Sequence, residues 1–563
     1  MTVPITTIPP ASLVNLGAHV RDLYKQHFAH ELAAGTVRPL VIPYSVLGAF
    51  ILPVLYFSVP HVNRPWLFRA RWLVMLFIVA FNLSETAGRS SANFAVGYLV
   101  GLLQAWGILW SATLLIWMRP QFEAERVEKR RRKRRRGEEG VEELVVRQES
   151  AMTKKSNKEN RQAMDAPDED IARSLAEGYE YYWQAYPADG SFLTRFEWSW
   201  DLVTSFRGTG WNWCIPILPR FAKPEKPLCG SLVDLTSLPL RTRQGYRRYT
   251  SSREWLRLRL IPMILSYLAL DALSVLMMKD PYFIFGPDFE AITITTSTTS
   301  SSSLHHRLTL PPILAALPSP ILFLYRALLC LPAILITIDL IMTSYQLLSH
   351  FVLAPLLGTR AELWHYPCVY GSFTPCVLDK GMAGFWGGWW HQTFRAAFSA
   401  PGLWLSRHGY IGDPRSDATG RALAGLLAFA QSGFLHALGS ITCLPPSQPW
   451  APPLFFLLCW AGTLVQAAAS AALGNWMTTT TTRPRWVRRA GHFMFVLAWL
   501  GCAQFLFCDD LARAGVWMLE PVAASPLRAL GLGRPGDSWW RWDSTYRPRW
   551  VVGEKWWESG IAV

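Results

Sequence analysis

The sequence predicts an all-α membrane protein with about eight transmembrane helices, seven to nine being allowed, and short interfacial helices. Three observations predict this class. Hydrophobic residues make up 51% of the 563 residues and charged residues only 17%, against ~25% charged residues in typical soluble domains. Uncharged stretches long enough to cross a hydrocarbon core of ~30 Å recur along the chain. The 28 tryptophans suit the boundary between lipid headgroups and hydrocarbon.

Composition and charge also exclude several classes of protein. The nine cysteines form no CxxC pair, so we expect neither a disulfide framework nor a metal site. The net charge of +15 is concentrated in residues 119–136, which hold ten Lys/Arg and three Glu. Such a run could bind nucleic acid, but it directly follows an apolar span, where basic residues mark the cytoplasmic side. We therefore expect membrane lipid, and no nucleic acid, as a partner.

Three predicted spans precede the basic run. The first covers residues 40–59, the second residues 69–84 and the third residues 93–118. Together they form an N-terminal membrane unit, residues 40–118. The segment before it, residues 1–39, lacks the pattern of a signal peptide.

A long hydrophilic loop, residues 119–254, follows these spans. Its basic run places it in the cytoplasm, so residues 1–39 are expected in the lumen. Residues 138–170 are charged and poor in aromatic side chains, which predicts disorder. Residues 192–219 are rich in tryptophan, which predicts a segment on the membrane surface.

Five more spans are predicted within residues 255–508, and a tail, residues 509–563, follows them. The five spans cover residues 258–278, 327–348, 422–444, 453–473 and 491–507. The Pro-rich residues 311–320 are predicted to be re-entrant or interfacial. Counting places the tail in the lumen although it holds seven Lys/Arg, a conflict that a re-entrant segment near residues 516–532 would remove.

Two carboxylates lie inside predicted spans. These are Asp271 and Asp339. A charged side chain at a helix centre costs about 2.5–3.5 kcal/mol on insertion scales. We therefore expect both side chains to face protein instead of lipid.

A histidine inside a predicted span is the sharpest chemical feature. Ser432, His436 and Ser440 are spaced four residues apart, so they form a polar stripe on one helix face. Ionisable groups inside a membrane are costly and point to function. A neutral imidazole accepts a proton at pH 7, as a general base must. The alternative is a structural hydrogen bond between helices.

A second feature precedes that span in a predicted cytoplasmic loop. Its sequence, residues 385–395, is FWGGWWHQTFR. A helix beginning after the two glycines would place His391 and Arg395 on one face and the tryptophans in the membrane interface. His391, Gln392 and Arg395 would suit an anionic cofactor such as coenzyme A. The alternative is a simple anchor on the membrane surface.

A third feature is RGTGWNW, residues 207–213. It contains two glycines but lacks the spacing of a nucleotide-binding loop, and no strand is predicted before it. We interpret it as a tight turn that displays interfacial tryptophans.

Together the three features resemble the fungal wax-synthase-like branch of the membrane-bound O-acyltransferases. That family shows RGxGWNW, FWGRxWHQxFR and SGxxH elements in this order, and the resemblance covers residues 195–475. It implies that residues 255–508 form the catalytic core and that an acyl group moves from acyl-CoA to an alcohol. By the same resemblance His436 is the catalytic base and His391 the second catalytic residue.

The resemblance also assigns the donor site. Four residues of the second feature would bind the acyl-CoA co-substrate: Trp386, Trp390, Gln392 and Arg395. No permanently bound cofactor is implied. Gly388 stands where the family pattern has arginine, so the contact that this arginine makes is either missing or supplied by Arg395.

Among relatives, the resemblance favours an O-acetyltransferase that uses acetyl-CoA to modify a hydroxyl of a terpenoid or meroterpenoid secondary metabolite. The implied partners are acyl-CoA, a hydrophobic alcohol and the lipid of the endoplasmic reticulum membrane. One alternative is a long-chain wax-ester synthase. An alternative of another class is a transporter in which Asp271, Asp339 and His436 relay protons.

Overall fold

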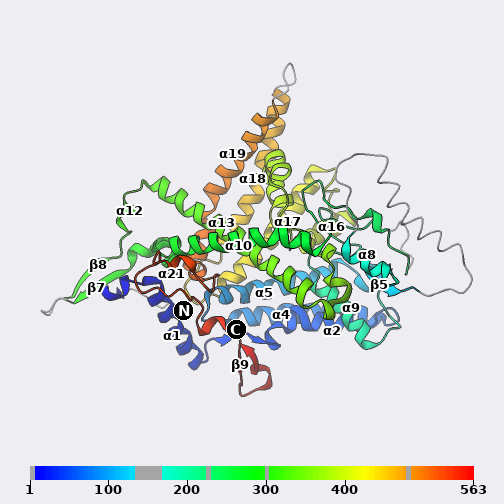
Figure 1. Ribbon diagram of the computed structural model, residues 1–563, viewed down its shortest axis with the longest axis horizontal. Coiled ribbons are helices and arrows are strands. Elements are labelled where there is room, and N and C mark those ends of the chain that lie inside the picture. The colour runs from blue at the N-terminus through cyan, green and yellow to red at the C-terminus, as the bar shows by residue number, and fades with distance from the viewer. Residues whose placement is uncertain (1–6, 133–167, 223–229, 298–302, 477–483, 563) are drawn as a thin grey trace, which may run out of the picture.

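The computed structural model describes residues 7–132, 168–222, 230–297, 303–476 and 484–562. Long helices dominate, and the strands are short and lie at the margins (Figure 1). Within these residues, six helices are long and apolar enough to cross a membrane, or seven if a pair bent by 41° is one span. The prediction of an all-α polytopic membrane protein is confirmed.

The six spans combine several helical elements. They are Pro65–Gly88, with α3 (Pro65–Arg69) and α4 (Arg71–Gly88); Phe94–Trp117, with α5 (Phe94–Ala112) and η4 (Thr113–Trp117); α10 (Ser252–Met277); Ser319–Val352, with α13 (Ser319–Leu347) and η7 (Leu348–Val352); α17 (Ala418–Ile441); and Ala451–Ala472 within α18 (Ala451–Trp476). The bent pair is α19 (Arg485–Ala503) and α20 (Phe505–Arg513).

The first predicted span, residues 40–59, is not one long helix. It is divided into η2 (Tyr44–Val46), η3 (Leu47–Ile51) and α2 (Leu52–Phe57), and the apolar helix Tyr44–Phe57 falls short of span length. Pro43 and Pro53 have no N–H to donate, which interrupts a regular α-helix here.

This broken helix nevertheless runs the same depth as its neighbours. At its start, β2 (Arg38–Pro39) pairs with β4 (Arg89–Ser90), directly after α4. At its end, the Gln121 side chain, just beyond η4, donates to the Phe57 carbonyl at 2.7 Å. The broken helix therefore begins level with the end of α4 and ends level with the end of η4.

The loop of residues 119–254 contains a strand pair that the sequence did not predict. β5 (Arg126–Arg131) and β6 (Tyr179–Gln184) form an antiparallel pair, in which Lys129 contacts Glu362 at 3.0 Å and Arg130 contacts Glu180 at 2.7 Å. The first part of the basic run is thus a paired strand. Of the segment predicted to be disordered, the part up to residue 167 lies outside the described residues.

Residues 168–170, the end of that segment, belong to ordered structure, because Asp168 caps α8 (Glu169–Ala176). The prediction of a membrane-surface segment at residues 192–219 is also wrong in part. Trp198, in α9 (Phe192–Thr204), and Trp211 are buried, because they pack edge to face inside the protein.

Asp271 and Asp339 both face protein, as predicted, and each lies beside an arginine. Asp339 contacts Arg259 of α10 at 2.8 Å. Asp271 accepts hydrogen bonds from Ser525 Oγ at 2.5 Å and from the Leu527 N–H at 3.0 Å.

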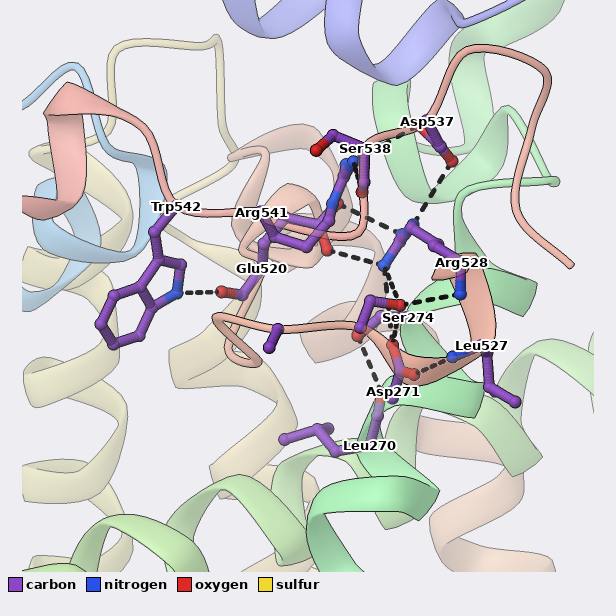
Figure 2. Close-up of polar contacts among 12 residues, drawn as sticks. Leu270, Asp271, Ser274, Glu520, Leu527, Arg528, Asp537, Ser538, Arg541 and Trp542 are labelled. Carbon is purple, nitrogen blue, oxygen red and sulfur yellow. Dashed lines mark hydrogen bonds and ion pairs between the residues drawn. The ribbon is translucent and has the colours of Figure 1, made fainter. Parts of the chain in front are cut away.

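Arg528 lies at the centre of a buried ion network in the tail (Figure 2). It lies 3.7 Å from Asp271 and 3.3 Å from Glu520 and Asp537, and Arg541 joins Glu520 at 2.8 Å. These carboxylates neutralise tail arginines locally, so the basic tail needs no re-entrant segment to explain its charge.

The tail covers one end of the helix bundle. Its helical elements are η12 (Val516–Met518) and α21 (Pro526–Ala529). It contacts α1 (Leu16–Ala33) through Arg21 and Glu520 at 3.4 Å. Its last strand, β10 (Gly560–Ala562), pairs with β3 (Val41–Ile42) and β9 (Arg549–Val551). The two ends of the chain therefore lie close together (Figure 1).

The Pro-rich residues 311–320, predicted to be re-entrant or interfacial, lie outside the helix bundle (Figure 1). They form the short helix α12 (Pro312–Ala315), which projects from the bundle (Figure 1) and leaves Ile313 82% exposed. The remaining elements are β1 (Thr7–Ile8), η1 (Pro10–Leu13), α6 (Pro120–Glu123), η5 (Leu235–Ser237), α11 (Tyr282–Phe285), η6 (Pro287–Ala291), β7 (Thr293–Ser297), β8 (Ser303–Arg307), α14 (Ala354–Leu357), η8 (Gly358–Ala361), η9 (Leu363–His365), η10 (Thr374–Leu378), α15 (Asp379–Gly384), η11 (Phe385–Trp389), α16 (Arg395–Arg407), η13 (Ser544–Tyr546) and η14 (Trp556–Glu558).

Candidate active site

His436 lies near the C-terminal end of α17, inside a cage of aromatic rings. Asp417 starts this helix by accepting the Gly420 N–H, and no proline interrupts the helix before His436. The imidazole stacks on Phe456 of α18, with ring centroids 5.2 Å apart, and meets the edge of Phe507 of α20 at 4.9 Å. Apolar rings of two neighbouring helices thus pack against one imidazole.

The polar stripe on α17 makes contacts to other helices, as its pattern predicted. Nδ1 of His436 lies 3.0 Å from the Tyr98 hydroxyl of α5. Ser440 donates to Asp510 of α20 at 3.0 Å, and both are fully buried. Nε2 of His436 makes no hydrogen bond within the described part of the chain. One ring nitrogen is therefore used structurally, and the other is free for chemistry.

The second sequence feature lies in a segment of α15, η11 and α16, residues 379–407, which we name the hairpin, instead of on one interfacial helix. At its base, Asp379 contacts Arg489 of α19 at 2.8 Å. Its tip reaches the aromatic cage, because Trp386 packs against Phe429 of α17 and Phe456 of α18, each at 5.8 Å. The hairpin therefore packs against the two helices that contribute rings beside His436.

The helix expected after the two glycines does not form there. η11 ends at Trp389, and α16 begins only at Arg395. The Gln392 side-chain amide donates to the carbonyls of Trp386 and Trp390, at 2.9 and 2.6 Å. Because these carbonyls bond to a side chain, the turn between η11 and α16 is fixed without helical hydrogen bonds.

His391 projects from this turn, and aromatic contacts connect it to His436. Its ring lies 5.4 Å from Trp390, Trp390 lies 5.6 Å from Trp386, and Trp386 packs on Phe456 beside His436. The two histidines are also close enough to interact electrostatically. Nδ1 of His391 and Nε1 of Trp386 are buried without hydrogen-bond partners among the described residues.

Gln392 and Arg395 hold the turn together. Arg395 Nη1 donates to Gln392 Oε1 at 2.8 Å and also to the Gly387 carbonyl. A Cβ at Gly388 would lie 3.0 Å from Cys376 Sγ, so a larger side chain at this position would have to displace that sulfur.

Arg207 is a candidate that the sequence interpretation missed. Its Nη2 donates to the Cys368 carbonyl at 3.2 Å, Nε is buried without a partner, and no described carboxylate pairs with it. It lies 5.7 Å from the centroid of Tyr246, whose hydroxyl is also unpartnered among the described residues, and it interacts electrostatically with His391. Burial lowers the pKa of Arg207 and raises the pKa of Tyr246.

The tight turn predicted at residues 207–213 is present. Gly208 and Gly210 adopt φ values of 64° and 81°, which favour glycine. A Cβ at Gly210 would lie 2.5 Å from His365. The glycine spacing of the motif therefore predicted the turn. It could not predict the surroundings of Arg207, because Tyr246 and Cys368 contact it from distant parts of the sequence.

Residues 366–458 match the family model described as the membrane bound O-acyl transferase family. The match contains the hairpin and α17, and so both histidines. The similarity to this family is confined to residues 366–458. Members of the family are acyltransferases of the EC 2.3.1 type, so the enzyme class is acyltransferase, with acyl-CoA as co-substrate. No curated protein and no solved structure matches the acyltransferase.

Two further observations concern the transporter alternative and metal binding. Asp271 and Asp339 are each paired with an arginine, an arrangement that, together with the family match, argues against the transporter relay. Within the described ranges, no group of three His, Cys, Asp or Glu side chains could hold a metal ion.

Proposed function

We propose that the acyltransferase moves an acetyl group from acetyl-CoA to a hydroxyl of a hydrophobic, terpenoid-type metabolite in the endoplasmic reticulum membrane. The observation that carries the proposal is the cage around His436, in which one imidazole nitrogen is bonded to Tyr98 and the other is free. Phe455, Phe456 and Phe507 pack against one another at 5.1–5.8 Å. A short acyl group needs less room among these rings than a long chain, and apolar rings suit a hydrophobic acceptor.

The chemistry needs only a base and a bound thioester. Nε2 of His436 takes the proton of the acceptor hydroxyl while the hydroxyl oxygen attacks the thioester carbonyl. A carbon–oxygen bond forms, the carbon–sulfur bond breaks, and the imidazolium returns the proton to the thiolate of coenzyme A. His391 is proposed to polarise the thioester carbonyl from the tip of the hairpin.

The proposed donor site lies where the hairpin meets the cytoplasmic loop. Trp386 and Trp390 supply apolar walls for the acyl end of the donor. Gln392 and Arg395 act mainly by holding the turn, with the remaining guanidinium nitrogens of Arg395 facing the donor. Arg207, a guanidinium without a carboxylate partner among the described residues, is proposed to bind an anionic group of coenzyme A.

The test is label transfer in microsomes from radioactive acetyl-CoA and palmitoyl-CoA to a panel of terpenoid and fatty alcohols. Wild type, His436→Ala and the matched control His408→Ala, an exposed histidine of the same region, are compared at equal protein. Acetyl transfer to a terpenoid alcohol, lost only in His436→Ala, would support the proposal. Palmitoyl transfer to fatty alcohol would replace it with wax-ester synthesis. Normal turnover by His436→Ala would refute the mechanism.

A further inference from the structure

Tyr98 approaches the proposed base from a span far away in the sequence. It lies 338 residues before His436 and outside the matched segment 366–458. Only 6% of its surface is exposed. Nothing in the family match assigns it a role.

The contact between α5 and α17 holds the Tyr98 ring in one place. Thr442 Oγ1 donates to the Gly97 carbonyl at 2.7 Å and accepts the Gly101 N–H at 3.0 Å. A Cβ at Gly439 would lie 2.9 Å from the Tyr98 ring. Small residues let two helices approach closely, so the ring can move little without separating them.

The two contacts of the Tyr98 oxygen determine where its proton points. The oxygen lies 3.0 Å from His436 Nδ1 and 3.4 Å from the His436 carbonyl oxygen. A carbonyl oxygen only accepts, and a tyrosine hydroxyl has a single proton. Both contacts are hydrogen bonds only if the hydroxyl donates to the carbonyl and the Nδ1–H of His436 donates to the hydroxyl oxygen.

This arrangement selects one form of the imidazole. A neutral imidazole carries one N–H, so a proton on Nδ1 leaves the lone pair of Nε2 free. With the reverse arrangement, Nε2 would carry the proton and could not act as a base. We propose that Tyr98 is a positioning residue for acyl transfer: its oxygen accepts the Nδ1–H of His436 and so presents Nε2 to the acceptor hydroxyl.

The inference rests on the proposed function and adds a residue to it. When Nε2 takes the proton of the alcohol, the imidazolium still donates Nδ1–H to the Tyr98 oxygen, so this contact persists through the step. When the proton passes to the departing thiolate, the same neutral form is restored. Tyr98 itself gains and loses no proton in the cycle.

The variant Tyr98→Phe removes the oxygen and keeps the ring. We expect kcat to fall about 10- to 100-fold, as on loss of a group that orients a histidine, with the KM values for acetyl-CoA and alcohol within twofold of wild type. The matched control is Tyr267→Phe, whose hydroxyl also donates to a backbone carbonyl far away in the sequence, that of Ala524 in the tail. This control should keep wild-type kcat.

A second readout separates positioning from a loss of folded protein. Each enzyme is offered an alkyl alcohol and a phenol of similar size. A phenol gives up its proton more easily and depends less on a base, so Tyr98→Phe should slow the phenol less than the alkyl alcohol. Partial unfolding would slow both acceptors equally, because the ratio does not depend on the amount of active enzyme.

Equal slowing of both acceptors, or an unchanged kcat, would overturn the role of Tyr98. Wild-type turnover is measured first. If wild type transfers no acyl group to any acceptor, the proposed function fails; if wild type turns over and Tyr98→Phe is unchanged, only the inference on Tyr98 fails.

Discussion

His391 carries a buried ring nitrogen without a hydrogen-bond partner among the described residues. If this nitrogen donates to the thioester carbonyl, removing it should cost about 10²-fold in kcat, as for other oxyanion donors. His391→Ala is therefore expected to lose about that factor. His391→Asn, whose amide nitrogen occupies the place of Nδ1, should stay within about tenfold of wild type. The measurement is kcat for acetyl transfer, with His408→Ala as the control. Equal activity of the Ala and Asn variants would contradict a hydrogen-bonding role.

Arg207 should matter only for donors that carry phosphate. Arg207→Gln is expected to raise the KM for acetyl-CoA about tenfold, the order of a charge-assisted hydrogen bond. With S-acetyl-N-acetylcysteamine, a thioester without phosphate, the variant and wild type should behave alike. Arg220→Gln is the matched control. Arg220 lies in the same loop as Arg207 and likewise donates to a backbone carbonyl, that of Cys214. An equal penalty with both donors would show that Arg207 acts on folding or on the thioester instead.

Sequence spacing could predict which residues to consider, but not all of their contacts. His436 was identifiable because a histidine in an otherwise uncharged span is costly. Tyr98 was not, because its contact crosses 338 residues of chain. Gln392 and Arg395 were predicted to bind the donor, whereas their observed contacts hold the turn. The catalytic and donor-binding roles of all six predicted site residues stay predictions.

At the scale of elements, the α5–α17 contact depends on glycine. A Cβ at Gly101 would lie 1.8 Å from the Leu438 carbonyl oxygen, so Gly101→Ala must separate the helices. Overpacking of this kind costs about 1–3 kcal/mol, and separation also draws Tyr98 away from His436. We expect a lower midpoint of thermal unfolding in detergent and a lower kcat.

Gly491→Ala is the control for this prediction. Gly491 lies within α19, and a Cβ there would meet nothing within 4 Å. Alanine stabilises a helix by about 0.5–1 kcal/mol relative to glycine. The control should therefore unfold at the wild-type temperature or higher. An equal fall of the thermal midpoint in both variants would contradict the explanation by close helix packing.

Helices with continuous apolar sequence were predictable, and irregular elements were not. α17 follows the capping residue Asp417 and matches the predicted span closely. The path of the hairpin was not predicted, because it depends on Gly381, with a φ of 61°, and on the side chain of Gln392. The broken helix Tyr44–Phe57 shows the same limit, because hydropathy reports apolar length and not helical regularity.

At the scale of the whole molecule, Arg528 joins the tail to the bundle. Its side chain is 1% exposed and lies within 3.7 Å of the carboxylates of Asp271, Glu520 and Asp537. Removing one partner of such a network costs about 3–5 kcal/mol, because buried charges are left uncompensated. Arg528→Met should therefore lower the thermal midpoint strongly in detergent.

Two comparisons make this prediction specific. Arg549→Met changes an exposed arginine of the same tail and should leave the midpoint unchanged. Adding Asp271→Asn to Arg528→Met removes one uncompensated charge, so the double variant should be more stable than Arg528→Met alone. A double variant that is less stable would show that the network does not act through charge.

The path of the chain predicts the sidedness of its ends. α1 and the tail pack on one another, so they lie on the same side of a membrane and the number of crossings between them is even. The six long spans and the bent pair give seven crossings, so an even number requires that the shorter broken helix Tyr44–Phe57 also crosses, which makes eight. Epitope tags at both termini should be protected from protease in sealed microsomes. A tag inserted at Arg415, before α17, should be cleaved, and a terminus cleaved alone would refute the pairing.

The pairing of β10 with β3 has a consequence for biosynthesis. β3 precedes the spans that the structure describes and β10 follows them, so these spans are made before the two strands can meet. Closing so long a loop costs entropy that grows only with the logarithm of its length. Until that closure, Asp271 and the face of α1 toward the tail lack their partners. A chain truncated before β10 would leave Asp271 and this face of α1 exposed. Cellular quality control could therefore recognise such truncated chains by these exposed groups.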